Sequence, residues 1–453
     1  MLKRKFLFLY EGIKPELIKY ILSVIINLSR SAESGFNLKI EVLSLEKKNS
    51  LQYKFLLVIS TAYLAVDINI QGFLALMPFI REEFALSSSR AGLYSSFHFL
   101  LATAVAVFSG RIVDKIGSKK GLVVGTGVLG ILMFMQSRSP NFTLILSLAL
   151  LNGLFFSIIT PSLNKTVMQR TTPDNRATSM GVMQMGGGIG GFTGAVFLPF
   201  LAEKIGWRNS VSFSALIAVL TAVFIFIFFK EKSGGRGEKA AAGSKNQLGF
   251  KDSIIKLFQN KDLLLVCLFG LILGFNSGAV PAHYTLYLTQ DIPLSRTAAG
   301  FAFGLLQIGG IIGRPLWGFL NDKFLNGSRS GGLVIVGLSL TLVMFYYFKI
   351  MSSLELPVYI VYLSSLILGF VSLGWMGLYF TAVIELASEK LAGIGTGLSL
   401  VFVRFGVLLS PPLFGLLADL NSSYQLSWLG MALITGLFTL VFAYIYKDKF
   451  AEV

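Results

Sequence analysis

The stretch Gly110-Arg-Ile-Val-Asp114-Lys115-Ile-Gly117-Ser-Lys119-Lys120 separates two long apolar runs, and a shorter copy of it occurs in the second half of the chain. The copy reads Gly318-Phe-Leu-Asn-Asp322-Lys323, so a shift of 208 residues superposes its glycine, aspartate and lysine on those of the first stretch. The same shift superposes four further residues upstream, which makes seven identities in thirty ungapped positions. The chain is therefore an internal duplication.

Apolar runs extend outward from both copies and recur at short intervals from Phe55 onward. Each run can cross a hydrocarbon layer about 30 Å thick, and runs of this length form helices because a helix bonds every backbone group within its own segment. The duplication and the runs together predict an all-α integral membrane protein with two pseudo-symmetric bundles of six helices. We expect the twelve spans at residues 54–80, 91–111, 121–138, 142–168, 177–203, 208–230, 262–289, 297–320, 331–350, 356–383, 391–418 and 425–446.

The composition agrees with a membrane protein and excludes several other classes. Of 453 residues 54% are hydrophobic and only 14% are charged, whereas a soluble domain has about a quarter of its residues charged. The net charge of +16 does not indicate a nucleic-acid partner, because the basic residues lie in short loops between the apolar runs. One cysteine, Cys267, and two histidines offer no disulfide and no metal site. No nucleophile–base pair or phosphate loop occurs, so we expect neither an enzyme nor a cofactor.

Four regions follow from the distribution of charged and apolar residues. Residues 1–50 form an N-terminal cytoplasmic extension, either loosely ordered or lying on the membrane surface, residues 51–230 the first bundle, residues 231–261 a cytoplasmic linker, and residues 262–453 the second bundle with a short tail. The linker is rich in lysine and small residues, which is typical of a flexible connection on the cytoplasmic side. Both termini are then cytoplasmic in a multi-pass protein of the plasma (inner) membrane.

Within the linker, a short amphipathic helix is expected up to Phe258, capped by Asp252 or Ser253. Such a helix would lie on the membrane surface.

The stretch that begins at Gly110 resembles the motif between the second and third helices of the major facilitator superfamily. The resemblance covers the chain after residue 50 and implies secondary transport of a small-molecule substrate by alternating access, with a monomer as the expected state. It also implies a cytoplasmic gate, although the second copy has Leu325 where the second glycine is expected. The gating residues would be Gly110, Arg111, Asp114, Lys115 and Gly117 in the first half, and Gly318, Asp322 and Lys323 in the second.

Asp67 lies near the middle of the first expected span, where a charge costs at least about 2.5–3.5 kcal/mol. Tyr63, Asp67 and Gln71 recur every fourth residue and form one polar stripe on an apolar helix. One interpretation is a proton-coupling carboxylate, since burial favours the neutral form of an acid; the other is a fixed ion pair or hydrogen-bonded group. His98 in the second span is another candidate for proton coupling, although a lone membrane histidine more often only satisfies hydrogen bonds.

Arg314 is the leading candidate for substrate binding. The stretch Gly313-Arg314-Pro315-Leu-Trp-Gly318 resembles the Arg-Pro-x-x-Gly of monocarboxylate transporters, whose arginine binds the substrate carboxylate, and oxalate/formate exchangers look similar. A guanidinium is permanently charged and can bind a carboxylate through two parallel hydrogen bonds. The alternative is a gate residue that faces Gln184.

Arg404 lies in the middle of the eleventh expected span, and a shift of 216 residues aligns it with Gly188. We interpret it as a second anion-binding arginine, as in aromatic-acid and dicarboxylate carriers of the superfamily that it resembles. The alternatives are an ion pair with Asp67 and a polar contact to the second helix. Four more residues are candidates for lining the substrate cavity, although each could equally be ordinary packing: Asn276, His283, Trp375 and Tyr379.

These residues favour a carrier of a small organic anion, most simply a carboxylate, that is coupled to protons or works by exchange. One alternative is an exporter of drugs or other metabolites by proton antiport, although the glycine-rich stretch from Gly186 to Gly194 lacks the Gly-Pro of that family's motif. Another is a non-transporting nutrient sensor in the membrane, for which the linker and the short tail offer little.

Overall fold

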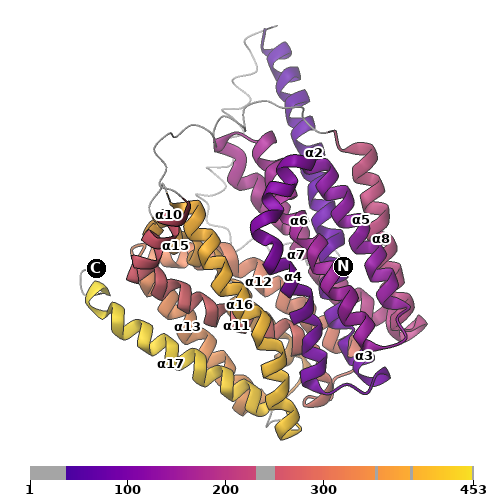
Figure 1. Ribbon diagram of the computed structural model, residues 1–453, viewed down its shortest axis with the longest axis vertical. Helices are drawn as coiled ribbons and strands as arrows, with labels where there is room; N and C mark the ends of the chain where they lie inside the picture. Colours follow the sequence, from indigo (N-terminus) through magenta and orange to yellow (C-terminus); the bar gives the residue numbers. More distant parts are fainter. Residues whose placement is uncertain (1–36, 231–249, 352–355, 388–390, 451–453) are drawn as a thin grey trace, which may run out of the picture. The chain divides into compact units, whose positions relative to one another are not determined.

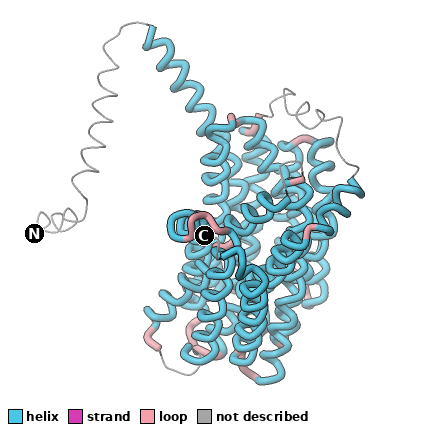
Figure 2. Tube along the Cα trace, turned by 90° about the vertical axis from the view of Figure 1, so that its left-hand side faces the viewer, coloured by secondary structure: helices cyan, strands magenta, loops and turns pink. Residues whose placement is uncertain are grey.

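The computed structural model describes residues 37–230, 250–351, 356–387 and 391–450, and every secondary-structure element in them is helical (Figures 1 and 2). Leu56–Val453 form one compact unit, within which all the contacts below lie. The helices of the first half are α2 (Asn37–Ala75), α3 (Met77–Glu83), α4 (Ser88–Ile116), α5 (Ser118–Ser137), α6 (Phe142–Arg170), α7 (Pro173–Ile205) and α8 (Trp207–Phe228). They are followed by α10 (Phe250–Gln259) and, in the second half, α11 (Lys261–Gln290), α12 (Arg296–Phe324), α13 (Arg329–Tyr346), the π-helical η3 (Tyr347–Met351), α14 (Val358–Leu373), α15 (Met376–Ala387), α16 (Ala392–Asn421) and α17 (Gln425–Phe450).

Eleven helical segments in the described part of the chain are long and apolar enough to cross a membrane. The twelfth is α4 when its two parts, bent by 70° beside Val107, are taken as one span. Twelve spans in two sets of six confirm the expected architecture.

Two of the expected spans break into separate helices, one at a local sequence signal and the other beside a close contact with a distant helix. We expected one span over 54–80, but α2 ends at Ala75 and α3 begins at Met77 with Pro78 in its first turn, because proline has no N–H to continue a helix. The span expected at 356–383 breaks at Gly374, where the backbone approaches Gly313 of α12 so closely that a Cβ would lie 2.7 Å from its Cα.

The helix expected in the linker is present as α10, but its expected cap is wrong. Asp252 and Ser253 lie inside the helix, which already includes Phe250. Asn260, between α10 and α11, caps α11 by accepting a hydrogen bond from the N–H of Leu263. Residues 1–36 and 231–249 lie outside the described residues, so the boundaries of the extension and the linker stay predictions.

The duplication is visible in a pair of buried asparagines. Asn69 of α2 donates to the carbonyl oxygens of Ala65 and Ser214, both at 2.9 Å. Asn276 of α11 donates in the same way to the carbonyl oxygen of Ile272 at 2.9 Å and to the hydroxyl of Thr435 at 3.0 Å. In each half, therefore, one asparagine ties the first helix to the last.

Two antiparallel helix pairs join the halves, α4 with α16 and α7 with α12, and we call them the two seams. We call the end of the unit that holds α3 the α3 end, and the end where α8 stops and α11 starts the linker end. From the α3 end inward, the α4–α16 seam joins Ser88 to Gly415, Gly92 to Pro411, Ser96 to Leu408 and Ala102 to Arg404. The α7–α12 seam joins Ala195 to Gly300, Val196 to Gly304 and Gly188 to Ile311.

Both seams stop about halfway along the helices. Beyond them, a Cβ built on Gly110, Gly181, Gly318 or Gly397 would have no atom of another described residue within 4 Å. These four glycines lie on α4, α7, α12 and α16, the four helices of the seams, toward the linker end. The structure is therefore closed between the halves at the α3 end and open at the linker end.

A carboxylate latches the closed end. Asp419 of α16 accepts hydrogen bonds from the N–H of Ser88 at 2.6 Å and from the N–H and hydroxyl of Ser89 at 2.9 and 2.6 Å. These are the first two residues of α4, where unpaired N–H groups and the helix dipole attract a negative charge. The bonds cross from one half to the other, so they must break if the α3 end opens.

We expect Asp419→Asn to weaken this closure by about 1–2 kcal/mol, because charge-assisted bonds at a helix N-terminus are stronger than neutral ones. The population open at the α3 end should rise roughly 5- to 30-fold. Spin labels at positions 138 and 422, in a Cys267→Ala background, report the distance between the halves at that end. Glu385→Gln is the matched control, since Glu385 pairs with Arg329 of its own half, away from the α3 end. An unchanged distance distribution in Asp419→Asn would contradict the latch.

Candidate functional site

A cavity of about 50 Å³ lies between α2, α7 and α12, where the α7–α12 seam ends. Its walls come from both halves of the chain, as an alternating-access site requires. The lining residues are Tyr63, Asp67 and Gln71 of α2, Gln184, Gly187, Gly188 and Gly191 of α7, Gln307, Gly310, Ile311 and Arg314 of α12, and Leu373 of α14.

The wall from α2 is the polar stripe that the sequence predicted, with all three of its residues lining the cavity. Successive members lie one turn apart, so Tyr63 is nearest the linker end, Asp67 is in the middle and Gln71 is deepest. The carboxylate of Asp67 is packed tightly against α7, because a Cβ on Gly187 would lie 2.7 Å from its Oδ2. Glycine at this position therefore makes room for the acidic group.

Arg314 faces this stripe from α12. It acts electrostatically on Asp67, yet no ion pair within 4.0 Å joins the two in the described part of the chain. Its Nε is buried and has no hydrogen-bond partner among the described residues. Arg314 is partly exposed, so its positive charge is available to a ligand in the cavity, and a guanidinium without a carboxylate partner attracts an anion. Gln184 also lines the cavity and is exposed.

The deep end of the cavity carries two amides. Gln71 and Gln307 lie on opposite sides of Gly191, whose Cβ would be 3.3 Å from the Cγ of the first and 3.6 Å from the Cδ of the second. The Oε1 of Gln71 and the Nε2 of Gln307 are both buried without a hydrogen-bond partner among the described residues. A buried unpaired polar atom is costly, so these two indicate a place for a ligand or water.

Arg404 does not line the cavity. Its Nη1 donates to the carbonyl oxygen of Ala102 at 3.1 Å, which is the last contact of the α4–α16 seam toward the linker end. Gly188, its partner in the duplication, makes the corresponding last contact of the α7–α12 seam, with Ile311. The contact with the second helix is one of the alternatives that the sequence left open, and no pair with Asp67 forms among the described ion pairs.

Asn276, Trp375 and Tyr379 lie inside the second half and away from the cavity lining. Asn276 makes the interhelical bonds described above. The indole of Trp375 donates to the hydroxyl of Ser277 at 3.0 Å and meets the ring of Tyr379 edge-on at 5.4 Å. In this conformation all three are packing residues.

The two histidines are also outside the cavity lining. His283 is buried in the second half, with Nε2 2.7 Å from the carbonyl oxygen of Pro411 and Nδ1 3.2 Å from the hydroxyl of Tyr424. His98 packs among aromatic rings, and neither of its ring nitrogens has a hydrogen-bond partner among the described residues. Neither histidine therefore lines the cavity together with Asp67 in this conformation.

In the first gating motif, Asp114 forms an ion pair of 2.8 Å with Lys165 of α6. Gly117 has a φ of +88°, which turns the chain sharply from α4 to α5. Gly110 lies on α4 facing open space, as described above, while Arg111 and Lys115 are exposed on the same helix.

In the second motif, Asp322 pairs with Arg329 at 2.6 Å, and Arg329 also pairs with Glu385 at 3.0 Å. Lys323 lies over the rings of Phe319 and Phe324. The glycine missing at Leu325 has a substitute two residues later, since the left-handed turn is made by Asn326 and Gly327. Both motif aspartates thus pair within their own halves in this conformation.

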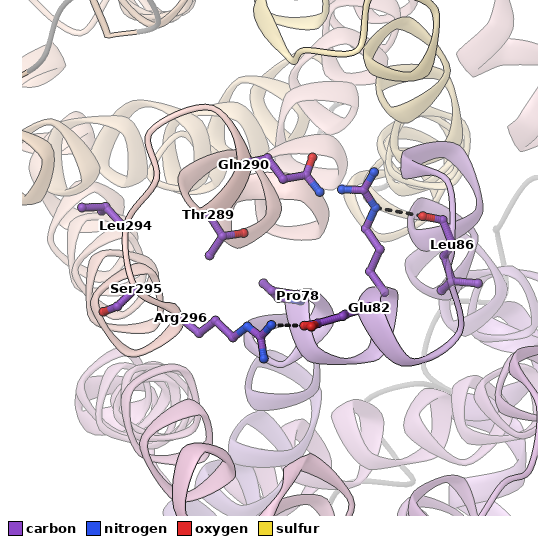
Figure 3. Close-up of a pocket in the computed structure, with 9 residues that line it drawn as sticks. Pro78, Glu82, Leu86, Thr289, Gln290, Leu294, Ser295 and Arg296 are labelled. Atoms are coloured by element: carbon purple, nitrogen blue, oxygen red, sulfur yellow. Dashed lines mark hydrogen bonds and ion pairs between the residues drawn. The ribbon is translucent and has the colours of Figure 1, made fainter.

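A larger cavity of about 540 Å³ opens at the α3 end and is also lined by both halves (Figure 3). Arg296 of α12 points across it and forms an ion pair with Glu82 of α3. Arg81 donates to the carbonyl oxygen of Leu86 at 2.9 Å. The ion pair between Arg296 and Glu82 therefore joins the two halves at the α3 end, whereas the bond of Arg81 stays within the first half.

Sequence reasoning identified Asp67 and Arg314 but missed Gln307 and the glycine wall. Gln307 precedes Arg314 by seven residues, and residues seven apart on a helix share a face, so the spacing was a usable signal. Gly187 and Gly191 belong to the glycine-rich stretch from Gly186 to Gly194, and their place in the cavity wall appears only when α12 is placed opposite.

The family model of the Major Facilitator Superfamily matches residues 59–403 and 266–452 of the chain. Among characterised relatives, the gentisate transporter of Corynebacterium glutamicum is 26% identical over 361 residues, or 76% of each chain. The cis,cis-muconate transport protein of Acinetobacter baylyi is 25% identical, covering 75% of this chain and 81% of the relative. Multidrug resistance protein 1 of Bacillus subtilis is 22% identical, covering 87% and 96%.

Solved structures show the same fold. A bacterial homologue of the human lysosomal transporter Spinster, in an inward-facing and unoccupied conformation, has a TM-score of 0.71 at 16% identity and covers 87% of this chain and 96% of its own. The match of the family model along nearly all of the spans, together with the twelve-helix architecture, leaves one assignment: the chain belongs to the Major Facilitator Superfamily.

Proposed function

We propose that this membrane transporter carries a small organic anion with one carboxylate, accompanied by a proton, through the cavity that holds Asp67 and Arg314. The observation that carries the proposal is the state of Arg314, which lines the same cavity as Asp67 but forms no ion pair with it among the described residues, and whose Nε is buried without a partner there. The termini lie in the cytoplasm of a plasma-membrane protein, so the linker end is the cytoplasmic end.

Arg314 binds the substrate carboxylate through its guanidinium. Its planar fork of donors matches the two oxygens of a carboxylate, and the charge is permanent at any physiological pH. Because the site is enclosed by three helices on its inner side, the attraction is stronger than at a fully exposed surface.

Asp67 carries the coupled proton, and charge balance gives the reason. Arg314 and ionised Asp67 bring opposite unit charges to the cavity, which is then neutral overall. A bound monocarboxylate would leave one negative charge uncompensated in the membrane, which is costly. Protonation of Asp67 restores neutrality, so one proton accompanies each monocarboxylate.

In the proposed cycle, the two halves move relative to each other by breaking and forming contacts at the seams. In this conformation the seams are closed at the α3 end, and the cavity lies at their inner limit. When the halves rock, the α3-end contacts separate, and the glycines of the linker end approach the opposite half. The cavity is then exposed to the other side of the membrane.

The relatives support this proposal without fixing the substrate. Two of those above are named as carriers of gentisate and cis,cis-muconate, both of which are organic acids. The match to a multidrug resistance protein over 87% of the chain keeps proton-driven export of drugs as the second candidate.

A ligand panel measured by thermal unfolding of the purified protein distinguishes these possibilities. It holds aliphatic and aromatic monocarboxylates, dicarboxylates, inorganic anions, sugars and cationic amphiphiles. A ligand at 100 times its dissociation constant stabilises the folded state by about 2.7 kcal/mol. We expect monocarboxylates to stabilise the protein, more strongly at lower pH. Stabilisation by cationic amphiphiles alone would overturn the proposal in favour of the exporter. Ligand binding without flux into liposomes would indicate a sensor.

A further inference from the structure

We propose that the transported monocarboxylate bears a hydroxyl group at the end remote from its carboxylate, and that Gln71 and Gln307 recognise this hydroxyl. The inference rests on the proposed function and deepens it by naming the substrate class. It is carried by the two amides at the deep end of the cavity, which the binding of a carboxylate by Arg314 leaves unexplained.

The two amides offer one acceptor and one donor to the same space. The Oε1 of Gln71 accepts and the Nε2 of Gln307 donates, and both atoms are buried without a partner among the described residues. The side chains come from opposite halves and meet over Gly191, which has no side chain to separate them. A hydroxyl group donates and accepts at once, so it satisfies both amides together.

A second carboxylate fits this end poorly. It would have no hydrogen to give to the Oε1 of Gln71, and it would approach Asp67, which lies one turn away on the same face of α2. An apolar end would leave both amide atoms unpaired after displacing water, which costs free energy. The site therefore selects a neutral group that can donate and accept.

The distance between the two recognition points limits the size of the substrate. Gln307 and Arg314 lie on one face of α12, seven residues apart, which corresponds to about 10.5 Å along the axis. The side chain of Arg314 is long and can cover part of this distance. A carboxylate and a hydroxyl separated by a four-carbon chain or a benzene ring match the remainder, and the cavity of about 50 Å³ must widen to admit such a body. Because Gly187, Gly188 and Gly191 of α7 have no side chains, the carbon chain or ring of the substrate can lie against the backbone of this helix.

The test compares matched acids that differ only in the hydroxyl. The probes are pentanoate with 5-hydroxypentanoate and benzoate with 4-hydroxybenzoate, and 4-methoxybenzoate serves as a probe that accepts but cannot donate. Dissociation constants are measured by calorimetry on the purified full-length protein and on Gln71→Leu, Gln307→Leu and Gln184→Leu. The last is the matched control, because Gln184 lines the cavity but is not at its deep end.

In the wild-type protein we expect the hydroxy acid of at least one pair to bind tenfold or more tightly than its partner, since a site built for a hydroxyl rejects an analogue that lacks it. Gln71→Leu and Gln307→Leu should each reduce that ratio to about one, whereas Gln184→Leu should keep it. Both deep-end variants should unfold at an equal or higher temperature without ligand, because each removes an unpaired buried amide. A lower unfolding temperature would assign the amides to structure and would overturn the inference.

The outcomes separate this inference from the function on which it rests. If both members of each pair bind equally and Arg314→Gln abolishes binding, the carrier proposal stands and the hydroxyl inference falls. If no acid binds the wild-type protein, the carrier proposal falls and takes the inference with it. If the methoxy acid binds as tightly as the hydroxy acid, the substrate hydroxyl does not donate a hydrogen bond to the Oε1 of Gln71, and that part of the inference is wrong.

Discussion

Replacing Arg314 by glutamine is expected to lower the affinity for a monocarboxylate about 30-fold or more. The change removes the positive charge from the cavity wall, and losing one partner of a bound charge pair costs about 2–5 kcal/mol. Arg314→Lys should give an intermediate loss, because it keeps the charge but not the planar fork of donors. Calorimetry with the acids above measures both values, and flux into proteoliposomes should fall in parallel.

Arg404→Gln is the informative control for this result. Arg404 bonds a backbone carbonyl in the α4–α16 seam and does not line the cavity, so its loss should leave the affinity within a few-fold. If Arg404→Gln abolished anion binding while Arg314→Gln did not, the substrate-binding site would lie at the α4–α16 seam instead. If both abolished it, the two arginines would act on one substrate in another conformation of the cycle.

Replacing Asp67 by asparagine is expected to uncouple transport from protons. Asparagine is neutral at every pH and resembles the protonated acid in shape, so the cavity with Arg314 and one carboxylate stays electrically balanced. Exchange of labelled for unlabelled substrate should therefore persist within a few-fold. Accumulation driven by a pH gradient should be lost entirely, and the affinity should no longer depend on pH. Proteoliposome uptake with and without a pH gradient gives both quantities.

Asp291→Asn provides a matched control, since Asp291 bonds Ser423 and Tyr424 and does not line the cavity, so it should not alter coupling. Full gradient-driven accumulation by Asp67→Asn would rule Asp67 out as the proton carrier. If Asp67→Asn loses both exchange and coupling, Asp67 has a role in substrate binding or in folding. The unfolding temperature of the variant distinguishes these two roles, since only a folding defect lowers it.

The fold could be predicted almost completely because its two determinants lie in the sequence itself. Apolar length fixes what can cross a membrane, and the repeated Gly110 and Gly318 stretches fix the duplication. The helix breaks at Leu76 and Gly374 escaped prediction for different reasons. Pro78 was a visible local signal, whereas the break at Gly374 accompanies a close approach to Gly313 that only the packed structure shows.

The candidate site could be predicted in part. Asp67 and Arg314 stand out because charges are rare in membrane helices, and both line the cavity. Arg404 stands out equally by that criterion, yet it faces a backbone carbonyl of α4. Which face of a helix turns toward the other half depends on packing between segments far apart in the chain. A single sequence does not determine this rotation, so Gln307 was missed and Asn276 was proposed.

The cavity lies at the limit of the α7–α12 seam, and the lining residues that meet across this seam are Gly188 with Ile311 and Gly191 with Gln307. The contacts that join the halves and the side chains that we propose to bind the cargo therefore overlap only in part. A lineage of such proteins can acquire a new cargo through a few substitutions at positions such as 71, 307 and 314, while the rocking motion is inherited unchanged. Closely similar chains can therefore carry chemically different compounds, and overall identity is a poor guide to cargo.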